Sequence, residues 1–321
     1  MEDSSNIEGF LLYSGFSGGF GSGFTSRLVQ SLENEFAKTI KIHVALVPSP
    51  MLNQSVLEPY NTILAESSLL DHVDSAFYVD NESLYKVCQN NNSQFKSGLE
   101  LTYPKMNMLI GDLSSKITSS LRHESDLNAT MNEIVHNLVP NSRLHHHMSA
   151  IVPCLNSNRP PFNSYTKLTT SLFELNTSFI SCDFSHGKFL RMAILYCSGE
   201  EADKLRKDNK QNEIDKAVNT CIKDNKTIQF ANEQTESSLL QNIKAGPVSI
   251  KSPSKNMSAC LLSTTSATGE YFRRVGEKFN RLHSKQAYLH LYAGEGMDLI
   301  EFSEAREDVL TLEHDYETLL K

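Results

Sequence analysis

The sequence predicts an α/β fold, with a partial doubly wound parallel sheet, a second α/β domain and a C-terminal helical hairpin. Three observations lead to this prediction. Near the start, an apolar run, a glycine-rich turn, a helical pattern and another apolar run follow one another, which is the order of a βαβ unit. Helical periodicity then extends from 103 to 121, and the segment 268–321 has a helical pattern throughout.

The first region, residues 1–102, contains the predicted parallel strands. Residues 9–13 (Gly-Phe-Leu-Leu-Tyr) are expected to form a short buried strand, and residues 24–36 a helix. A second strand is expected at 41–47 and a third at 76–79. Because helical segments alternate with these strands, we expect the sheet to be parallel.

The rest of the chain divides into a core connecting helix at 103–122, an intermediate α/β domain at 123–262 and a helical region at 263–321. In the last segment, apolar residues recur at spacings of three and four, which predicts an amphipathic helix packed on the protein's own body. Its stripe consists of Phe302, Ala305, Val309, Leu312, Tyr316 and Leu319. Asp298, followed by Glu301, resembles a capping box at the start of this helix.

The composition excludes several functional classes. The formal net charge of the 321 residues is −8 and the basic residues are scattered, which argues against a nucleic-acid partner. The six cysteines form no Cys-x-x-Cys pair, which indicates free thiols in a reducing compartment. The N-terminus lacks the apolar stretch of a signal peptide, and no apolar run is long enough to span a membrane. We therefore expect a cytoplasmic protein without a membrane partner.

The strongest local signal is the glycine-rich turn between the first strand and the first helix. Glycines allow backbone N–H groups to approach a phosphate closely, and the helix N-terminus behind them adds positive partial charge. The turn consists of Gly18, Gly19, Phe20, Gly21, Ser22 and Gly23. No lysine follows the last glycine, so this is not a P-loop, and the pattern is not the dinucleotide fingerprint either. A tight connection without a ligand is the alternative.

Several segments of the chain resemble the tubulin family. Ser17–Gly23 stands where tubulins have Gly-Gly-Gly-Thr-Gly-Ser-Gly. The other matching segments are Leu57–Asn61, Val79–Glu82, Asn137–Pro140, Asp183–Lys188, Gly294–Met297 and Glu301–Asp308. The resemblance extends over everything after residue 8. It implies a Rossmann-like tubulin GTPase domain at 1–102 that is incomplete at its N-terminal side, followed by the family's intermediate and C-terminal regions.

Within the family the chain is more similar to α-tubulins than to β-tubulins. Glu133 stands where α-tubulins have a catalytic glutamate and β-tubulins a lysine. Thr227–Phe230 is an α-type sequence, and the loop 231–259 has nearly the α length. Arg273–Val275, in contrast, is β-like. The chain therefore resembles a divergent α-tubulin.

The resemblance implies a GTP site, with each role taken over at a matching position. The implied residues are Gly18, Gly19, Gly21, Ser22 and Gly23 for the phosphates, Glu58 for the ribose, Asn81 and Asn107 for the guanine edge, and Tyr103 for stacking on the base. Taken singly, each residue has an ordinary alternative. Asn81 could cap a helix, and Tyr103 could be a core residue.

Glu133 has a different implied role. In the family this glutamate meets the GTP of the adjacent β-type subunit, where it would position or deprotonate the attacking water. A solvated helix residue is the alternative. We expect hydrolysis in trans rather than an autonomous GTPase.

Two features limit what the site is expected to bind. Phe20 replaces the family's phosphate-loop threonine, so we expect weak or lost GTP binding, and no residue present predicts a magnesium site. The run His145–His147, with His136 nearby, does not predict a metal site, because consecutive residues of a strand point to opposite faces.

Two functions compete at this point. The first is an α-tubulin-like, GTP-binding constituent of microtubules whose partners are a β-tubulin-like subunit and the lattice, located in the cytoplasmic cytoskeleton. The second is a truncated, nucleotide-free pseudo-tubulin that acts as an interaction module or regulator of tubulin. An incomplete gene model is a third interpretation of the missing N-terminal part.

Overall fold

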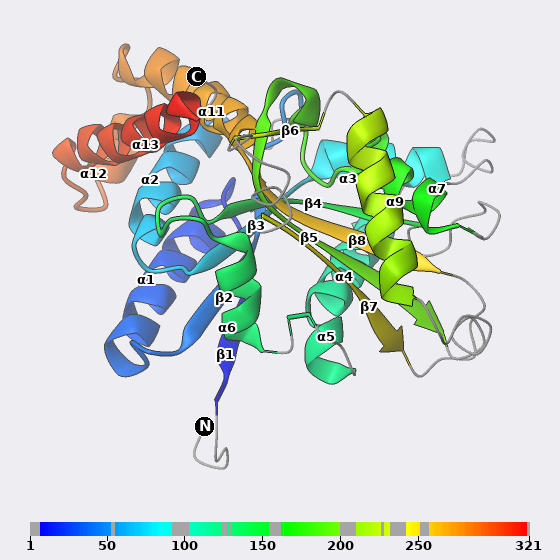
Figure 1. Ribbon diagram of the computed structural model, residues 1–321. Coiled ribbons are helices and arrows are strands. Elements are labelled where there is room, and N and C mark those ends of the chain that lie inside the picture. The colour runs from blue at the N-terminus through cyan, green and yellow to red at the C-terminus, as the bar shows by residue number, and fades with distance from the viewer. Residues whose placement is uncertain are drawn as a thin grey trace.

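Eight strands in the described part of the chain form one mixed sheet with helices on both faces (Figure 1). This computed structural model describes residues 7–52, 55–91, 103–123, 127–128, 130–153, 162, 164–199, 210–225, 228–231, 242–250 and 257–319. The strand order is β1-β2-β3-β4-β8-β5-β6, and β7 also pairs with β5. The predicted α/β class is confirmed.

The first part of the chain alternates strands and helices. Its elements are β1 (Gly9–Gly15), α1 (Gly19–Glu35), β2 (Ile40–Val47), α2 (Glu58–Leu70), β3 (Ser75–Asp80) and α3 (Asn81–Asn91). The three strands are parallel, with Gly15 opposite Leu46 and Val47 opposite Asp80. Their carboxyl ends therefore lie side by side at one edge of the sheet.

The middle of the chain extends the same sheet. Its elements are α4 (Tyr103–Ile117), α5 (Ser119–Arg122), α6 (Met131–Leu138), β4 (His146–Val152), α7 (Tyr165–Leu172), β5 (Lys188–Gly199), α9 (Lys210–Asp224), β6 (Gln229–Phe230), β7 (Ile243–Ile250) and β8 (Ser258–Thr265). Strand β4 is parallel to β3 but antiparallel to β8, which is in turn antiparallel to β5. The β3–β4 pairing joins the predicted first and second α/β regions into one sheet.

Three helices at the end of the chain form a layer over α2 (Figure 1). They are α11 (Gly269–His283), α12 (Leu289–Ala293) and α13 (Ile300–Thr318). The predicted apolar stripe of α13 is buried from Phe302 to Tyr316, so the helix packs on the protein's own body as predicted. At its start, the Asp298 carboxyl accepts from the Ile300 N–H at 3.0 Å.

Two apolar cores lie on the two faces of the sheet because successive strand residues point to opposite sides. In β2, Ala45 belongs to the core beneath α1, α2 and the C-terminal helices, whereas Val44 belongs to the core beneath α3, α4 and α6. None of the helices in the described ranges has the length and hydropathy needed to cross a bilayer.

Three local predictions differ from the structure. Strand β1 is only half-buried, and Tyr13 is 51% exposed, because β1 is the last strand of the described sheet and pairs there with β2 alone. Helix α1 begins at Gly19, earlier than expected, because the Ser22 N–H bonds to the Gly18 carbonyl. The long helix breaks at Thr118, whose hydroxyl donates back to the Ser114 carbonyl at 2.8 Å.

Candidate functional site

The carboxyl ends of β1, β2 and β3 bring three predicted site segments to one edge of the sheet. The glycine-rich turn follows β1, the loop that leads to Glu58 follows β2, and Asn81 follows β3 directly. In open α/β sheets, ligands bind in the crevice outside this edge. The topology therefore groups three of the predicted nucleotide-binding segments.

The glycine-rich turn ends at an uncapped helix N-terminus. Gly18 is the N-cap residue of α1, and in the described part of the chain no side chain caps this end. Gly18 and Gly23 have open space where a side chain would stand. Gly21 differs, because a Cβ there would lie 2.8 Å from the Gly15 carbonyl oxygen. Gly21 is therefore required by close packing, whereas Gly18 and Gly19 are exposed, so that a ligand can approach the backbone there.

Ser22 and Phe20 behave differently from what their predicted positions imply. The Ser22 side chain is buried, and its hydroxyl donates to the Gly18 carbonyl at 2.8 Å, within the helix itself. Phe20 is 83% exposed, and its ring stacks on Phe24 one turn later, with centroids 5.4 Å apart. The phenyl ring therefore covers the outside of α1 instead of filling the space over the turn.

Helix α2 holds the turn in place through Asn61. The Asn61 amide donates to the Ser17 carbonyl at 3.1 Å, and its oxygen accepts from the Tyr292 hydroxyl at 2.7 Å. Asn61 is buried, so these bonds are shielded from water. A single side chain thus connects the turn, α2 and α12.

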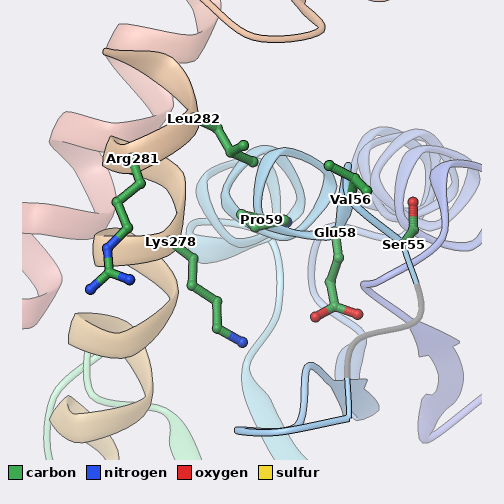
Figure 2. Close-up of a pocket in the computed structure, with 7 residues that line it drawn as sticks. All are labelled: Ser55, Val56, Glu58, Pro59, Lys278, Arg281 and Leu282. Carbon is green, nitrogen blue, oxygen red and sulfur yellow. The ribbon is translucent and has the colours of Figure 1, made fainter. Parts of the chain in front are cut away.

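Glu58 lies at the first position of α2 and lines a pocket of about 560 Å³. The pocket is lined by Ser55, Val56, Glu58 and Pro59 on one side and by Lys278, Arg281 and Leu282 of α11 on the other. Figure 2 shows the Glu58 and Lys278 side chains projecting to the same side of the pocket. Burial lowers the pKa of Lys278, and the Glu58 carboxylate opposes that lowering. The pocket therefore combines a carboxylate acceptor with ammonium and guanidinium donors.

Lys278 also holds the loop that follows β2. Its ammonium donates to the Pro50 carbonyl at 3.2 Å. From the other side, the Glu82 carboxyl accepts from the Met51 N–H at 3.1 Å. The loop that leads to Glu58 is thus fixed by residues of two helices.

Asn81 is not the cap of α3, because Asp80 has that role. The buried Asp80 carboxyl accepts from the Ser83 N–H at 2.8 Å and from the Ser181 N–H at 2.5 Å. The side chain of Asn81 is half-buried. It is therefore not needed as the cap of α3, which was its alternative role.

Tyr103 and Asn107 lie one turn apart on α4, which packs against α3. Both are exposed, and Tyr103 is 70% exposed, so Tyr103 is not the core residue that its alternative role required. Their spacing places them on one side of the helix.

Glu133 lies at the other end of the sheet. It stands in the first turn of α6, is exposed, and its N–H donates to the Thr130 hydroxyl at 3.2 Å. The side chain of Met131, also on α6, lies against Gly9, the first residue of β1. The glycine-rich turn, in contrast, comes after Gly15, the last residue of β1. Figure 1 shows α6 beside β1 on the side of the N-terminus. A strand of this length spans roughly 20 Å, so Glu133 is remote from the turn.

The histidine run is part of the core. His146 bonds to the Tyr316 hydroxyl at 3.1 Å, and His147 bonds to the Thr264 hydroxyl at 2.8 Å. The two rings thus point to opposite faces of β4. Burial lowers the pKa of His146 well below its usual value and lowers that of His147 to about 3, so both rings are neutral.

The sequence did not predict the buried carboxyl of Glu66 on α2, which bonds to two tyrosines. The signal was present, because Glu66 stands three residues from both Ile63 and Leu69, on the apolar face of α2.

Comparisons with known proteins point to one family. Residues 1–89 match the family model described as "Tubulin/FtsZ family, GTPase domain", and residues 142–277 match "Tubulin C-terminal domain". The chain is 37% identical to the tubulin alpha-B chain of Neurospora crassa over 98% of its own length and 68% of that relative. It is 37% identical to the tubulin alpha chain-like 3 protein of Mus musculus, over 98% of this chain and 69% of the relative. It is 36% identical to the tubulin alpha chain of Zymoseptoria tritici, over 98% of this chain and 68% of the relative.

Proposed function

The chain belongs to the tubulin family, and on that premise we propose that it is an α-tubulin-type, GTP-binding structural subunit of microtubules. Its partners in this proposal are a β-tubulin-like subunit and the microtubule lattice, in the cytoplasmic cytoskeleton. The relatives named above support the α type, since each is described as a tubulin alpha protein.

One observation supports GTP binding most directly, namely the grouping of the glycine-rich turn, Glu58 and Asn81 at one edge of the parallel strands. The uncapped N-terminus of α1 favours an anion, and a carboxylate accepts hydrogen bonds from ribose hydroxyls. In the proposed arrangement, Gly18, Gly19, Gly21 and Gly23 bind the phosphates through backbone N–H groups. Asn81, Tyr103 and Asn107 would bind the base.

We assign Ser22 a smaller part than its position implied. Its hydroxyl is already donated to backbone carbonyls of α1. Its proposed contribution to phosphate binding is therefore through the backbone.

Hydrolysis is proposed to occur in trans. Glu133 is remote from the chain's own glycine-rich turn and is exposed at the opposite end of the sheet. In the proposed arrangement, this surface meets the nucleotide of an adjacent subunit, where the Glu133 carboxylate would orient water. No autonomous GTPase activity is proposed.

A second function, a nucleotide-free interaction module, is favoured by Phe20. An aromatic ring that is 83% exposed in the turn offers apolar contact area to another protein. Loss of the family's threonine hydroxyl at the same position removes one hydrogen bond to phosphate, worth roughly 1.5–3 kcal/mol.

Fluorescent GTP titration of the full chain separates the two functions, with ATP as the control ligand. Saturable binding that GTP but not ATP displaces supports the first. Absence of GTP binding, combined with co-sedimentation with microtubules, supports the second. Absence of both would refute the tubulin-type role.

A further inference from the structure

A buried carboxyl joins the C-terminal helices to the sheet. Glu66 of α2 is 4% exposed, and both of its carboxyl oxygens are hydrogen-bonded. The Tyr78 hydroxyl lies 2.5 Å from one oxygen, and the Tyr271 hydroxyl lies 2.8 Å from the other. Tyr78 belongs to β3 and Tyr271 to α11, so the carboxyl bridges the sheet, α2 and the C-terminal layer.

The rings around this carboxyl come from four elements. Tyr78 lies 5.2 Å from Tyr271 and 5.2 Å from His146 of β4, measured between ring centroids. His146 in turn bonds to the hydroxyl of Tyr316 on α13. All three tyrosines are fully buried, and burial raises their pKa values, so they remain neutral.

In the described part of the chain, charged and titratable groups also lie beyond these rings. Arg274 of α11 lies over the outer face of Tyr271 at 6.0 Å and donates to the Ser181 carbonyl. The Cys182 thiol is buried near the same tyrosine, and burial raises its pKa to about 12. From α13, Asp308 bonds to Ser67 on the exposed side of α2. Helix α1 meets this part of α2 through the neutral pair Gln30 and Ser68.

We propose that Glu66 is a proton-dependent latch, which fastens α11 and α13 to α2 and the sheet when its carboxyl is neutral and loosens them when it is ionised. When Glu66 is ionised, the Tyr78 hydroxyl donates to the carboxylate. When Glu66 is neutral, the carboxyl proton can be donated to the Tyr78 hydroxyl oxygen, so the Glu66–Tyr78 bond persists in both protonation states. The two states differ in charge, because the ionised carboxylate is a charge enclosed by neutral groups, and such burial is strongly unfavourable. Moving α11 outward relieves it by admitting water.

The direction of the pH effect follows from burial. Burial raises the pKa of Glu66 to about 7, and the hydrogen bonds from Tyr78 and Tyr271 oppose part of that rise. A carboxyl whose pKa is higher in the docked state binds its proton more tightly there. Docking is therefore strongest below the ordinary glutamate pKa and weakens as pH rises through about 7.

The nearby His146 has the opposite effect on the pH dependence of docking. Burial lowers the pKa of His146, so its proton is disfavoured in the docked state. Any effect of His146 would weaken docking as pH falls, and the two contributions can be separated by their sign.

The experiment measures hydrogen-exchange protection factors in α11 and α13 of the full chain at about pH 5.5 and about pH 8, each relative to the intrinsic rate at that pH. The wild-type factors are expected to fall by about tenfold or more at the higher pH. Glu66→Gln keeps the size and the acceptor oxygen without the charge, so its factors should not fall. Asp308→Asn is the matched control, because it removes an exposed carboxylate from the same α2–α13 contact, and it should behave like the wild type.

A direct measurement makes the test independent of any variant. Infrared difference spectra of the wild-type protein should show a protonated carboxyl band that disappears with a midpoint near neutral pH. Equal protection at both pH values in the wild type, or an equal fall in Glu66→Gln, would overturn the latch. So would the absence of a carboxyl band that titrates near neutral pH. None of these readouts depends on GTP binding, so the latch and the proposed function fail separately.

Discussion

The Asn61 side chain donates a hydrogen bond to the Ser17 carbonyl at 3.1 Å, which ties the start of α2 to the glycine-rich turn. The turn's geometry therefore depends on this buried amide as well as on the glycines. Since the proposed phosphate contacts are all backbone N–H groups, a shift of the turn would misalign several of them together.

Replacing Asn61 by Asp is expected to weaken GTP binding. The aspartate keeps an oxygen for the Tyr292 hydroxyl, but it places a carboxylate oxygen against the Ser17 carbonyl. Loss of one buried hydrogen bond and the added repulsion should weaken affinity by roughly tenfold to a hundredfold. Titration with fluorescent GTP measures this change in affinity. Tyr292→Phe, which removes only the other bond of Asn61, is the control, and an equal loss in both variants would contradict the role of the Ser17 contact.

Phe20→Thr is expected to strengthen GTP binding. The substitution restores a hydroxyl in the turn and removes a ring that is 83% exposed. A gained hydrogen bond to a charged phosphate is worth roughly 1.5–3 kcal/mol, which is about tenfold to a hundredfold in affinity. Phe24→Thr removes the stacked partner without adding a hydroxyl to the turn, and serves as the control. If calorimetric titration finds no gain for Phe20→Thr, a hydroxyl at this position makes no hydrogen bond to the phosphates.

Glu133→Gln is expected to slow GTP hydrolysis in copolymers with a β-type subunit by on the order of 10²–10⁴-fold. The amide keeps the shape of the side chain and its place in the first turn of α6 but cannot take a proton. Phosphate release per polymerised subunit is the measurement. Glu174→Gln, at another exposed glutamate, is the control. Equal phosphate release from Glu133→Gln and wild-type copolymers would exclude the role in trans.

His147 is expected to make the fold sensitive to acid. The Thr264 hydroxyl donates to the Leu138 carbonyl, so it accepts from Nδ1–H of His147, and Nε2 is the nitrogen left without a proton. Within the described residues Nε2 has no hydrogen-bond partner, so protonation there would create an unsatisfied buried donor.

The sign of this pH dependence follows from the pKa of His147. Burial lowers it from the ordinary 6.5 to about 3, so the unfolded chain binds more protons between these values. The stability that this histidine contributes is complete above about pH 6.5 and is lost as pH falls toward 3. Urea denaturation measures the free energy of unfolding at each pH. As pH is lowered from 6.5 to 4, this free energy should fall in the wild type by on the order of 3 kcal/mol more than in His147→Leu. His283→Leu, at a half-buried ring on α11, is the control, and parallel pH profiles for His147→Leu and the wild type would disprove the assignment.

Local sequence patterns were sufficient to predict several elements of this fold. The βαβ order, the glycine-rich turn and the stripe from Phe302 to Tyr316 could be predicted, because each depends on periodicity or backbone freedom within a short segment. The motifs from Ser17–Gly23 to Glu301–Asp308 also identified the family, because residue identities persist where geometry is shared.

Contacts between side chains that are distant in the sequence could not be predicted and are known only from the fold. Glu66 and Tyr271 are 205 residues apart, and no periodicity of α2 or α11 predicts that their side chains bond. The same holds for the bond between Asp80, the cap of α3, and the N–H of Ser181, which lies far away in the sequence. It also holds for Glu133, whose distance from the turn depends on the end of β1 at which α6 packs. The secondary-structure elements and the family could thus be predicted from local sequence patterns. The folded sheet determines that the Glu66 carboxyl is buried and that Glu133 and the glycine-rich turn lie at opposite ends of β1, because burial and the distance between segments arise only once the strands are paired.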